Sequence, residues 1–353
     1  MIDKLEALIA RISEPDQAAK IRALERQSQL TKPTGSLGRL EELSVWLAGI
    51  FGSERPKISG KAVIVCAGDH AVTLEGVSAY PSEVTPAMVM NFLRGGAAVN
   101  AIAGVVDASV FVLDVGVNAD LPDHPNLISN KVRRGAGNIV RESAMNRDEA
   151  TRAILVGADA AARAIRDGAN LLAAGDMGIG NTTPSAALTA WFTGLEPRAV
   201  TGRGTGADDA TLEKKIRAIE LALERVRALG QSDALGILAE LGGLEIAAMA
   251  GVMLECAASK VPVVVDGFIA GAAALVAAQL EPKSVAFMTA SHISQEPGHI
   301  AQLRHLKLEP LFDYGLRLGE GTGALLAFPM LEAAARTLSE MATFAEASVP
   351  DRE

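Results

Sequence analysis

The chain has 353 residues, 49% of them hydrophobic, which is enough for one large domain and a smaller one. Lys and Arg number 33 against 42 Asp and Glu, and the formal charge of −9 removes the electrostatic attraction to nucleic acids and anionic membranes. The two cysteines, Cys66 and Cys256, are too few for a disulfide scaffold and have no zinc-type spacing. We expect a protein of a reducing cytosol that binds neither nucleic acid nor membranes.

The first six residues carry acidic side chains where a signal peptide requires a basic segment followed by an apolar run. The longest apolar stretch, 267–278, has 12 residues, well short of the ~20 that a bilayer needs. We therefore expect a soluble, cytoplasmic protein in which this stretch is a buried helix.

Five short runs rich in β-branched or aliphatic residues predict strands that are buried on both faces, as in a parallel sheet. In chain order they are 62–66, 110–113, 170–174, 261–265 and 284–288. Polar or turn residues follow each run, and ligands of parallel α/β sheets bind beyond the carboxyl ends of the strands. We expect these followers to converge on one site, where their carboxylates would suit ribose hydroxyls. The acidic followers are Asp69, Asp114, Asp176 and Asp266.

Helical patterns lie between the predicted strands, most clearly over 208–229, where apolar residues recur at spacings of 4, 3, 4 and 3. The alternation predicts an α/β fold, a Rossmann-like doubly wound parallel sheet flanked by helices. The two chain ends lack such strands. We expect a large α/β domain over 56–308 that carries the active site, and a smaller helical domain built from 1–55 and 309–353.

A glycine-rich segment, 175–184, follows the third predicted strand and opens a helix, since Asn181, Thr182 or Thr183 can cap it and Pro184 suits the first turn. Such a turn presents backbone N–H groups and a positive helix end, which suit a phosphate. A dinucleotide fingerprint would need glycine at Thr183, and no Gly-Lys-Ser/Thr of a P-loop occurs. A phosphate cradle and a plain strand-to-helix turn both remain open.

Three further segments admit two interpretations each. Lys214 and Lys215 follow a second glycine loop, 201–206, and either reach an anion or are solvated. Glu320 lies between glycines and is either an unshielded carboxylate near a ligand or an ordinary surface residue. Tyr80 precedes a proline and either stacks on a planar ligand or packs.

Metal binding is not expected, because the five histidines form no HExxH motif and His299 and His305 are six residues apart. Neither cysteine has an obvious neighbouring base, so both are expected in the core.

Taken in order, segments between about residues 30 and 335 resemble the nicotinate-nucleotide:dimethylbenzimidazole phosphoribosyltransferase family. The segments that carry the resemblance are Lys32-Pro-Thr-Gly-Ser-Leu-Gly-Arg-Leu40, Gly175-Asp-Met-Gly-Ile-Gly-Asn-Thr-Thr-Pro184, Gly242-Gly-Leu-Glu-Ile, Asp266-Gly-Phe, Ser291-His292 and Arg317-Leu-Gly-Glu-Gly-Thr-Gly-Ala324. The resemblance implies a Rossmann-like homodimer without cofactor or metal. The implied reaction transfers the phosphoribosyl group of nicotinate mononucleotide to 5,6-dimethylbenzimidazole, giving α-ribazole 5′-phosphate and nicotinate for the cobalamin lower ligand.

The resemblance also implies roles for individual residues. Glu320 matches the catalytic base, and Asp176, which is glutamate in some relatives, is the second catalytic position. The base-binding pocket falls on Tyr80, Met88, Met177 and Leu318. Phosphoribosyl contacts fall on Gly178, Gly180, Asn181, Thr182, Thr183 and Lys215. Two alternatives are a nucleotide-binding protein of this fold without the activity, which the intact Glu320 motif disfavours, and a nicotinamide-cofactor oxidoreductase, which the failed fingerprint disfavours.

Overall fold

A wholly parallel sheet forms the centre of the molecule in the computed structural model, which describes residues 1–204, 206 and 208–350. Its seven strands are ordered β3-β2-β1-β4-β5-β6-β7. The chain runs outward from β1 to β3, returns to place β4 beside β1, and then runs outward to β7. This is the predicted doubly wound topology, with its switch point between β1 and β4. The strands are β1 (Lys61–Gly68), β2 (Ser109–Gly116), β3 (Leu127–Ser129), β4 (Leu171–Met177), β5 (Val263–Val265), β6 (Met288–His292) and β7 (Pro310–Phe312).

Four of the five predicted strands lie in the sheet, and the fifth prediction is wrong. Residues 282–287 form a 3-10 helix, with Pro282 in its first turn and the Glu281 side chain accepting from the N–H of Lys283, so the strand begins only at Met288. Several predicted followers are in fact the last residues of strands, among them Asp114, Asp176 and His292. The edge strands β3 and β7 were not predicted.

Two separate hydrophobic layers cover the two faces of the sheet, which explains the continuous apolar runs. Alternate strand residues such as Ile64 and Ala174 face one layer, and Val63 and Ala173 face the other. The first layer contains α1 (Ile2–Ala10), α6 (Arg147–Arg166), α11 (Leu244–Ala258) and α12 (Phe268–Leu280). The second contains α3 (Arg39–Phe51), α4 (Val84–Leu93), α5 (Ala98–Val105) and α14 (Thr322–Glu340).

Helix α11 lies between α6 and α12 and is buried on all sides. It approaches α6 so closely that a Cβ at Gly251 would lie 1.8 Å from the carbonyl oxygen of Ile154, so these backbones touch only because glycine has no side chain. The predicted apolar stretch 267–278 is the buried helix α12, as expected.

Six further helices also contribute buried residues to the first layer. They are η1 (Ala71–Glu75), α7 (Thr182–Thr193), α8 (Pro197–Val200), α9 (Asp209–Leu229), α10 (Ala234–Leu241) and α13 (Pro297–Leu306). The predicted helix over 208–229 is confirmed as α9. Asp208 caps it by accepting from the N–H of Thr211, and left-handed Gly230 ends it.

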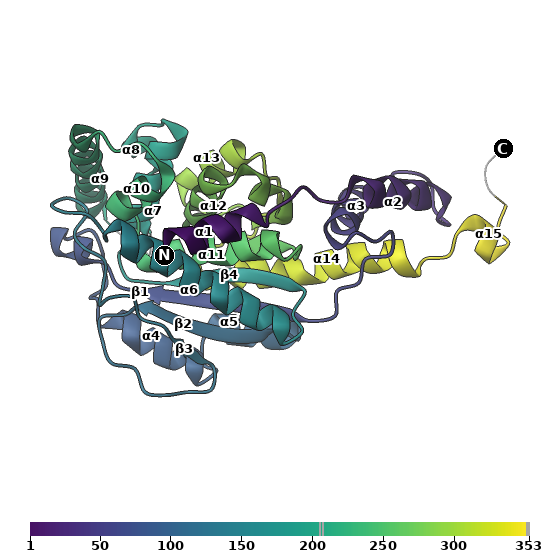
Figure 1. Cartoon of the computed structure of the whole chain (residues 1–353), viewed down its shortest axis with the longest axis horizontal. Coiled ribbons are helices and arrows are strands. Elements are labelled where there is room, and N and C mark those ends of the chain that lie inside the picture. The colour runs from purple at the N-terminus through teal and green to yellow at the C-terminus, as the bar shows by residue number, and fades with distance from the viewer. Residues whose placement is uncertain (205, 207, 351–353) are drawn as a thin grey trace.

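The two chain ends divide between two bodies. In Figure 1, α2 (Gln17–Gln29), α3, the distal part of α14 and α15 (Phe344–Ala347) project from the sheet as a helical lobe. Helix α1, however, packs on α6 and α11, and β7 pairs with β6 in the sheet. The boundaries 56–308 and 1–55 plus 309–353 stay a prediction, and these contacts join the outermost N-terminal helix and residues 310–312 to the large domain.

One stretch, Val84–Val105, is apolar and long enough to cross a membrane by composition. In the fold it is divided into α4 and α5 by the turn at residues 94–97. Helix α4 lies against β1, β2 and β4, so the stretch covers one face of the sheet.

Candidate active site

A pair of adjoining cavities opens at the carboxyl ends of β4, β5 and β6. Both are lined by Asn181, Thr182 and Gly204, so they form one continuous cleft. The first also borders residues 77–79, Gly178 to Gly180, Arg203 and Lys215. The second also borders Asp176, residues 267–269, His292, Ser294, Glu296 and residues 317–319. The residues that follow three of the five predicted strands therefore converge on one site, whereas those after the first two, 68–70 and 114–116, do not line it.

Segment 178–183, the glycine loop, joins β4 to α7. Asn181 occupies the N-cap position of α7, but its side chain makes no capping hydrogen bond and instead donates from Nδ2 to Oδ2 of Asp176 at 2.8 Å. The predicted side-chain cap is therefore wrong, whereas Pro184 does lie in the first turn. In the first turn the N–H of Thr183 donates to the carbonyl oxygen of Gly180 at 3.1 Å and Pro184 carries no N–H, so an anion would be attracted mainly by the positive end of the helix dipole.

Lys215 brings a positive charge to the glycine loop from helix α9. Its Nζ donates to Oγ1 of Thr182 at 3.0 Å and to the carbonyl oxygen of Gly202 at 2.8 Å. The side chain is almost completely buried, and burial lowers the pKa of this ammonium while the charge of Glu296 opposes the shift. Of the predicted phosphoribosyl contacts, Thr183 alone does not line the cleft, because it is fully buried behind it.

Glu320 lies in a turn of unusual backbone geometry. Gly319, Glu320 and Gly321 have φ angles of 84°, 63° and 87°, so three successive residues are left-handed. The turn packs directly on β4, where a Cβ at Gly175 would lie 2.3 Å from the carbonyl oxygen of Glu320. Flanking glycines permit this conformation, and the close fit against Gly175 holds it.

The carboxylate of Glu320 is buried and has a weak partner. Its Oε2 accepts from the N–H of Val99 at 3.3 Å, at the start of α5. Burial raises the pKa of Glu320 above its ordinary value, and the Val99 hydrogen bond only partly offsets the shift. A carboxylate with a raised pKa is a stronger proton acceptor, as a general base must be.

Asp176 links the glycine loop to the Glu320 turn. It lines the cleft and accepts from Asn181, and a Cβ at Gly319 would lie 2.7 Å from its Oδ1. Burial, reinforced by the neighbouring charge of Asp266, raises the pKa of Asp176 to about 8. The side chain is therefore mainly a neutral acid at pH 7, able both to donate and to accept a hydrogen bond.

The other strand-end acids serve the backbone. Asp114 accepts from the N–H of Val117 at 3.0 Å and pairs with Lys131 at 2.8 Å. Asp69 accepts from Asn118, and Asp266 accepts from two residues at the start of α14. The prediction that all four acids gather for ribose hydroxyls is wrong, because loop and helix N–H groups already bind three of them.

The four predicted base-pocket residues do not share one environment. Met177 and half-buried Met88 belong to the same hydrophobic layer, on the side of the sheet that carries α5 and Val99. Tyr80 is 49% exposed beside residues 77–79 of the first cavity, and Leu318 is 54% exposed on the wall of the second. The two methionines thus belong to one hydrophobic layer and line neither of the two cavities, whereas Leu318 lines the second cavity and Tyr80 lies next to the first.

Three cleft residues were missed as site candidates. Arg317 donates to the carbonyl oxygen of Gly204, and Glu296 accepts from the N–H of the same glycine at 2.7 Å. His292 stacks on Phe312, and burial lowers the pKa of its imidazole to about 4, so it is neutral. Arg317 and His292 lie within segments that carried the family resemblance, whereas Glu296 had no signal in the sequence.

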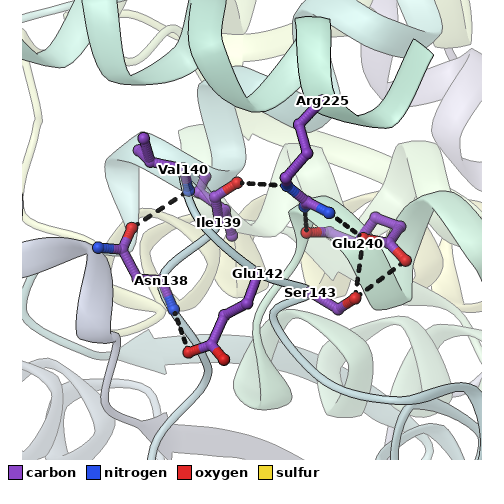
Figure 2. A network of polar contacts seen from close by, with 7 residues as sticks. All are labelled: Asn138, Ile139, Val140, Glu142, Ser143, Arg225 and Glu240. Carbon is purple, nitrogen blue, oxygen red and sulfur yellow. Dashed lines mark hydrogen bonds and ion pairs between the residues drawn. The ribbon is translucent and has the colours of Figure 1, made fainter. Parts of the chain in front are cut away.

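A polar network joins the loop 138–143 to helices α9 and α10 (Figure 2). Arg225 of α9 donates to the carbonyl oxygen of Ile139 and pairs with Glu240 of α10, which also accepts from Ser143. Asn138 of the same loop donates to Glu75, at the end of η1, at 2.7 Å. The network therefore ties the segment that precedes Tyr80 to the helix that carries Lys215.

No cluster of three metal-ligating side chains occurs among the residues that the structure describes. Residue 205 of the second glycine loop lies outside the described residues.

The fold and the site define a Rossmann-like α/β enzyme with an anion site beside a buried carboxylate. Comparison with known proteins narrows this class: the model of the phosphoribosyltransferase family matches residues 12–349, and the chain belongs to that family. The resemblance inferred from the motifs is thereby confirmed.

Individual relatives agree over nearly the whole chain. A Chloroflexus aurantiacus protein named nicotinate-nucleotide–dimethylbenzimidazole phosphoribosyltransferase is 53% identical over 351 residues, 99% of this chain and 100% of the relative. A Deinococcus radiodurans protein of the same name is 54% identical over 352 residues, 98% and 96% of the two chains. The crystal structure of the Thermus thermophilus enzyme of that name has a TM-score of 0.91 at 50% identity and covers 96% of this chain and 100% of its own.

Proposed function

We propose that this chain transfers the phosphoribosyl group of nicotinate mononucleotide to 5,6-dimethylbenzimidazole, forming α-ribazole 5′-phosphate and nicotinate for the cobalamin lower ligand. One observation carries the proposal: Asp176 contacts both the anion-binding glycine loop, through Asn181, and the turn that holds Glu320. In this proposal the glycine loop holds the phosphate and the neighbouring turn supplies the proton acceptor, with Asp176 between the two segments. The names of the full-length relatives support the choice of substrates.

The chemistry needs one base. A benzimidazole nitrogen attacks C1′ from the face opposite nicotinate, its lone pair forms the new C1′–N bond, and the configuration inverts from β to α. The bond between C1′ and the pyridinium breaks, and its electron pair stays on the pyridine nitrogen, so nicotinate leaves without a proton. The new benzimidazolium then loses its N–H proton to Glu320. General-base catalysis of this kind contributes typically ~10²–10⁴-fold.

The rest of the site holds the substrates. The 5′-phosphate binds at the N-terminus of α7 with the Lys215 ammonium beside it. Asp176, as a neutral acid, orients a ribose hydroxyl or the incoming base. The flat base is assigned to Met88, Met177, Tyr80 and Leu318, of which the two polarizable methionines belong to one hydrophobic layer and the other two are about half exposed. Holding both substrates makes the reaction nearly unimolecular, which is a large part of its acceleration.

Assembly and location are part of the same proposal. The homodimer is proposed on the resemblance to the family. Two buried free cysteines are compatible with a cytoplasmic location. Light scattering of the purified chain tests the dimer, and a monomer at micromolar concentration would contradict it.

A turnover assay tests the function. Incubation with nicotinate mononucleotide and a panel of bases should give a nucleotide of α configuration, identified by mass and by NMR, together with stoichiometric nicotinate. The absence of product with every base would leave a nucleotide-binding protein, and an absorbance change that depends on NAD(P)H would indicate an oxidoreductase.

A further inference from the structure

Asp266 is a completely buried carboxylate that the proposed reaction does not use. It follows β5 and points at the start of α14, where Oδ2 accepts from the N–H of Gly321 at 3.2 Å and Oδ1 accepts from the N–H of Ala324 at 2.8 Å. Both oxygens are thus occupied by the backbone of the first helical turn. A carboxylate in this position takes the place that an anion occupies at other helix N-termini.

The residue immediately before this helical turn is Glu320. Its own left-handed conformation, with φ of 63°, is unfavourable for a residue with a side chain. Such a conformation persists only where the surroundings determine it. Here Gly175 bounds the turn on one side, and the hydrogen bond from Gly321 to Asp266 fixes the next peptide group on the other.

We propose that Asp266 is a positioning residue. Its hydrogen bonds with the backbone N–H groups of Gly321 and Ala324 fix the position of the Glu320 carboxylate. The proposal rests on the function proposed above, in which Glu320 accepts the proton. Because Asp266 joins β5 to α14, it connects the general base, Glu320, to the rigid centre of the sheet rather than to a surface loop.

Asp266→Asn tests the proposal with little change of volume. The amide keeps one acceptor oxygen and turns its NH₂ group toward the other backbone N–H, so one of the two hydrogen bonds is lost. We expect kcat to fall by about 10²-fold, the cost of a small misplacement of a catalytic group, with the KM for nicotinate mononucleotide within about twofold of wild type.

Asp114→Asn is the matched control. Asp114 is also a buried strand-end acid that accepts from a backbone N–H, but it lies on β2 and holds Val117 and Lys131. We expect its kcat to stay near that of wild type at equal folded fraction. Equal losses in the two variants would show that Asp266 has only a structural role and would overturn the proposal.

A double-variant cycle with Glu320→Gln tests whether Asp266 affects turnover through Glu320. If it does, Asp266→Asn added to Glu320→Gln should lower kcat by less than about twofold, because the group it positions is already inactive. A further loss as large as in the wild-type background would overturn the proposal. If Asp266→Asn does not fold, Asp266→Ser, which retains one acceptor oxygen, takes its place in the same cycle.

Amide hydrogen exchange tests whether Asp266 holds the Glu320 turn and does not depend on an activity measurement. Protection of residues 319–325 should fall in Asp266→Asn and remain in Asp114→Asn. Unchanged protection in Asp266→Asn would overturn the proposal. Wild-type enzyme without turnover on any base would contradict the proposed function instead, and the exchange result would still decide whether Asp266 holds the Glu320 turn.

Discussion

Two sides of the proposed site are built in opposite ways. Asp176, Asp266 and Glu320 are at most 7% exposed, and they lie on strand ends or on a turn packed against β4. Tyr80 and Leu318 are about half exposed, on loops. The comparison indicates that rigid groups, whose positions the sheet fixes, carry out the proposed proton transfer. Base recognition depends instead on exposed loop side chains that can change conformation. Substitutions on the first side should therefore change kcat, and substitutions on the second should change KM or base preference.

Glu320→Gln should have the largest effect, because it preserves shape and removes the proton acceptor. We expect single-turnover rates at saturating substrates to fall by ~10²–10⁴-fold without loss of substrate binding. Glu255→Gln, at a buried glutamate paired with Arg11 away from the cleft, is the control and should retain turnover. A Glu320→Gln rate within a few-fold of wild type would exclude the general-base role.

Lys215→Met should come next and should act on binding. Methionine retains the apolar stem and removes the charge, so the KM for nicotinate mononucleotide should rise by ~10–100-fold, the value of a charge-assisted hydrogen bond, with little change for the base. Lys214→Met, at the neighbouring residue on the same helix, is the matched control. An equal rise in KM with nicotinate riboside, which lacks the phosphate, would show that Lys215 does not act on the phosphate.

Tyr80→Ala and Met88→Ala probe the adaptable side. Loss of the tyrosine ring should raise the KM for the base by the equivalent of ~1–3 kcal/mol, with binding of nicotinate mononucleotide unchanged. Met88→Ala should alter the ranking of bases, measured as competition between 5,6-dimethylbenzimidazole and adenine in one reaction. Tyr314→Ala, at the other tyrosine, is the control. Wild-type product ratios in both Tyr80→Ala and Met88→Ala would show that the base pocket lies elsewhere.

Asp176→Asn should have the smallest effect on turnover, about tenfold, since the amide retains hydrogen bonding and the acid is already neutral at pH 7. A loss greater than that of Glu320→Gln would mean that the two residues exchange or share their roles.

The same substitution should stabilise the fold at high pH. The pKa of Asp176 is raised from 3.8 in the unfolded chain to about 8 in the folded protein, so the folded state holds more protons between these values. The contribution of Asp176 to the free energy of unfolding of the wild-type protein therefore decreases as the pH rises across that window. Asparagine does not titrate, so the gain in urea midpoint of Asp176→Asn should grow from pH 5 to pH 8. A gain that does not vary with pH would contradict the raised pKa.

The sequence by itself determined the central strands and the glycine loop. Strands buried on both faces must be apolar at every position, and this is why 62–66 and 170–174 could be predicted without a partner. The apolar periodicity likewise marked the helix over 208–229, which is α9. Local signals failed where strands have three residues, as in β3 and β7, and where Pro282 and the Glu281 cap turned an apolar run into a 3-10 helix.

Only the tertiary structure decided what the polar residues do. The sequence singled out Asp114, Asp176 and Asp266 alike, but an acid's role depends on which N–H groups approach its oxygens and how much water remains around it. In this fold Asp266 accepts from backbone N–H groups at the start of α14, more than fifty residues further along the chain. Burial raises the pKa of both Asp176 and Asp266, but of the three acids only Asp176 lines the cleft. Lys215 meets Thr182 in the same way. These contacts arise from the order of strands in the sheet, which residue spacing along the chain does not encode.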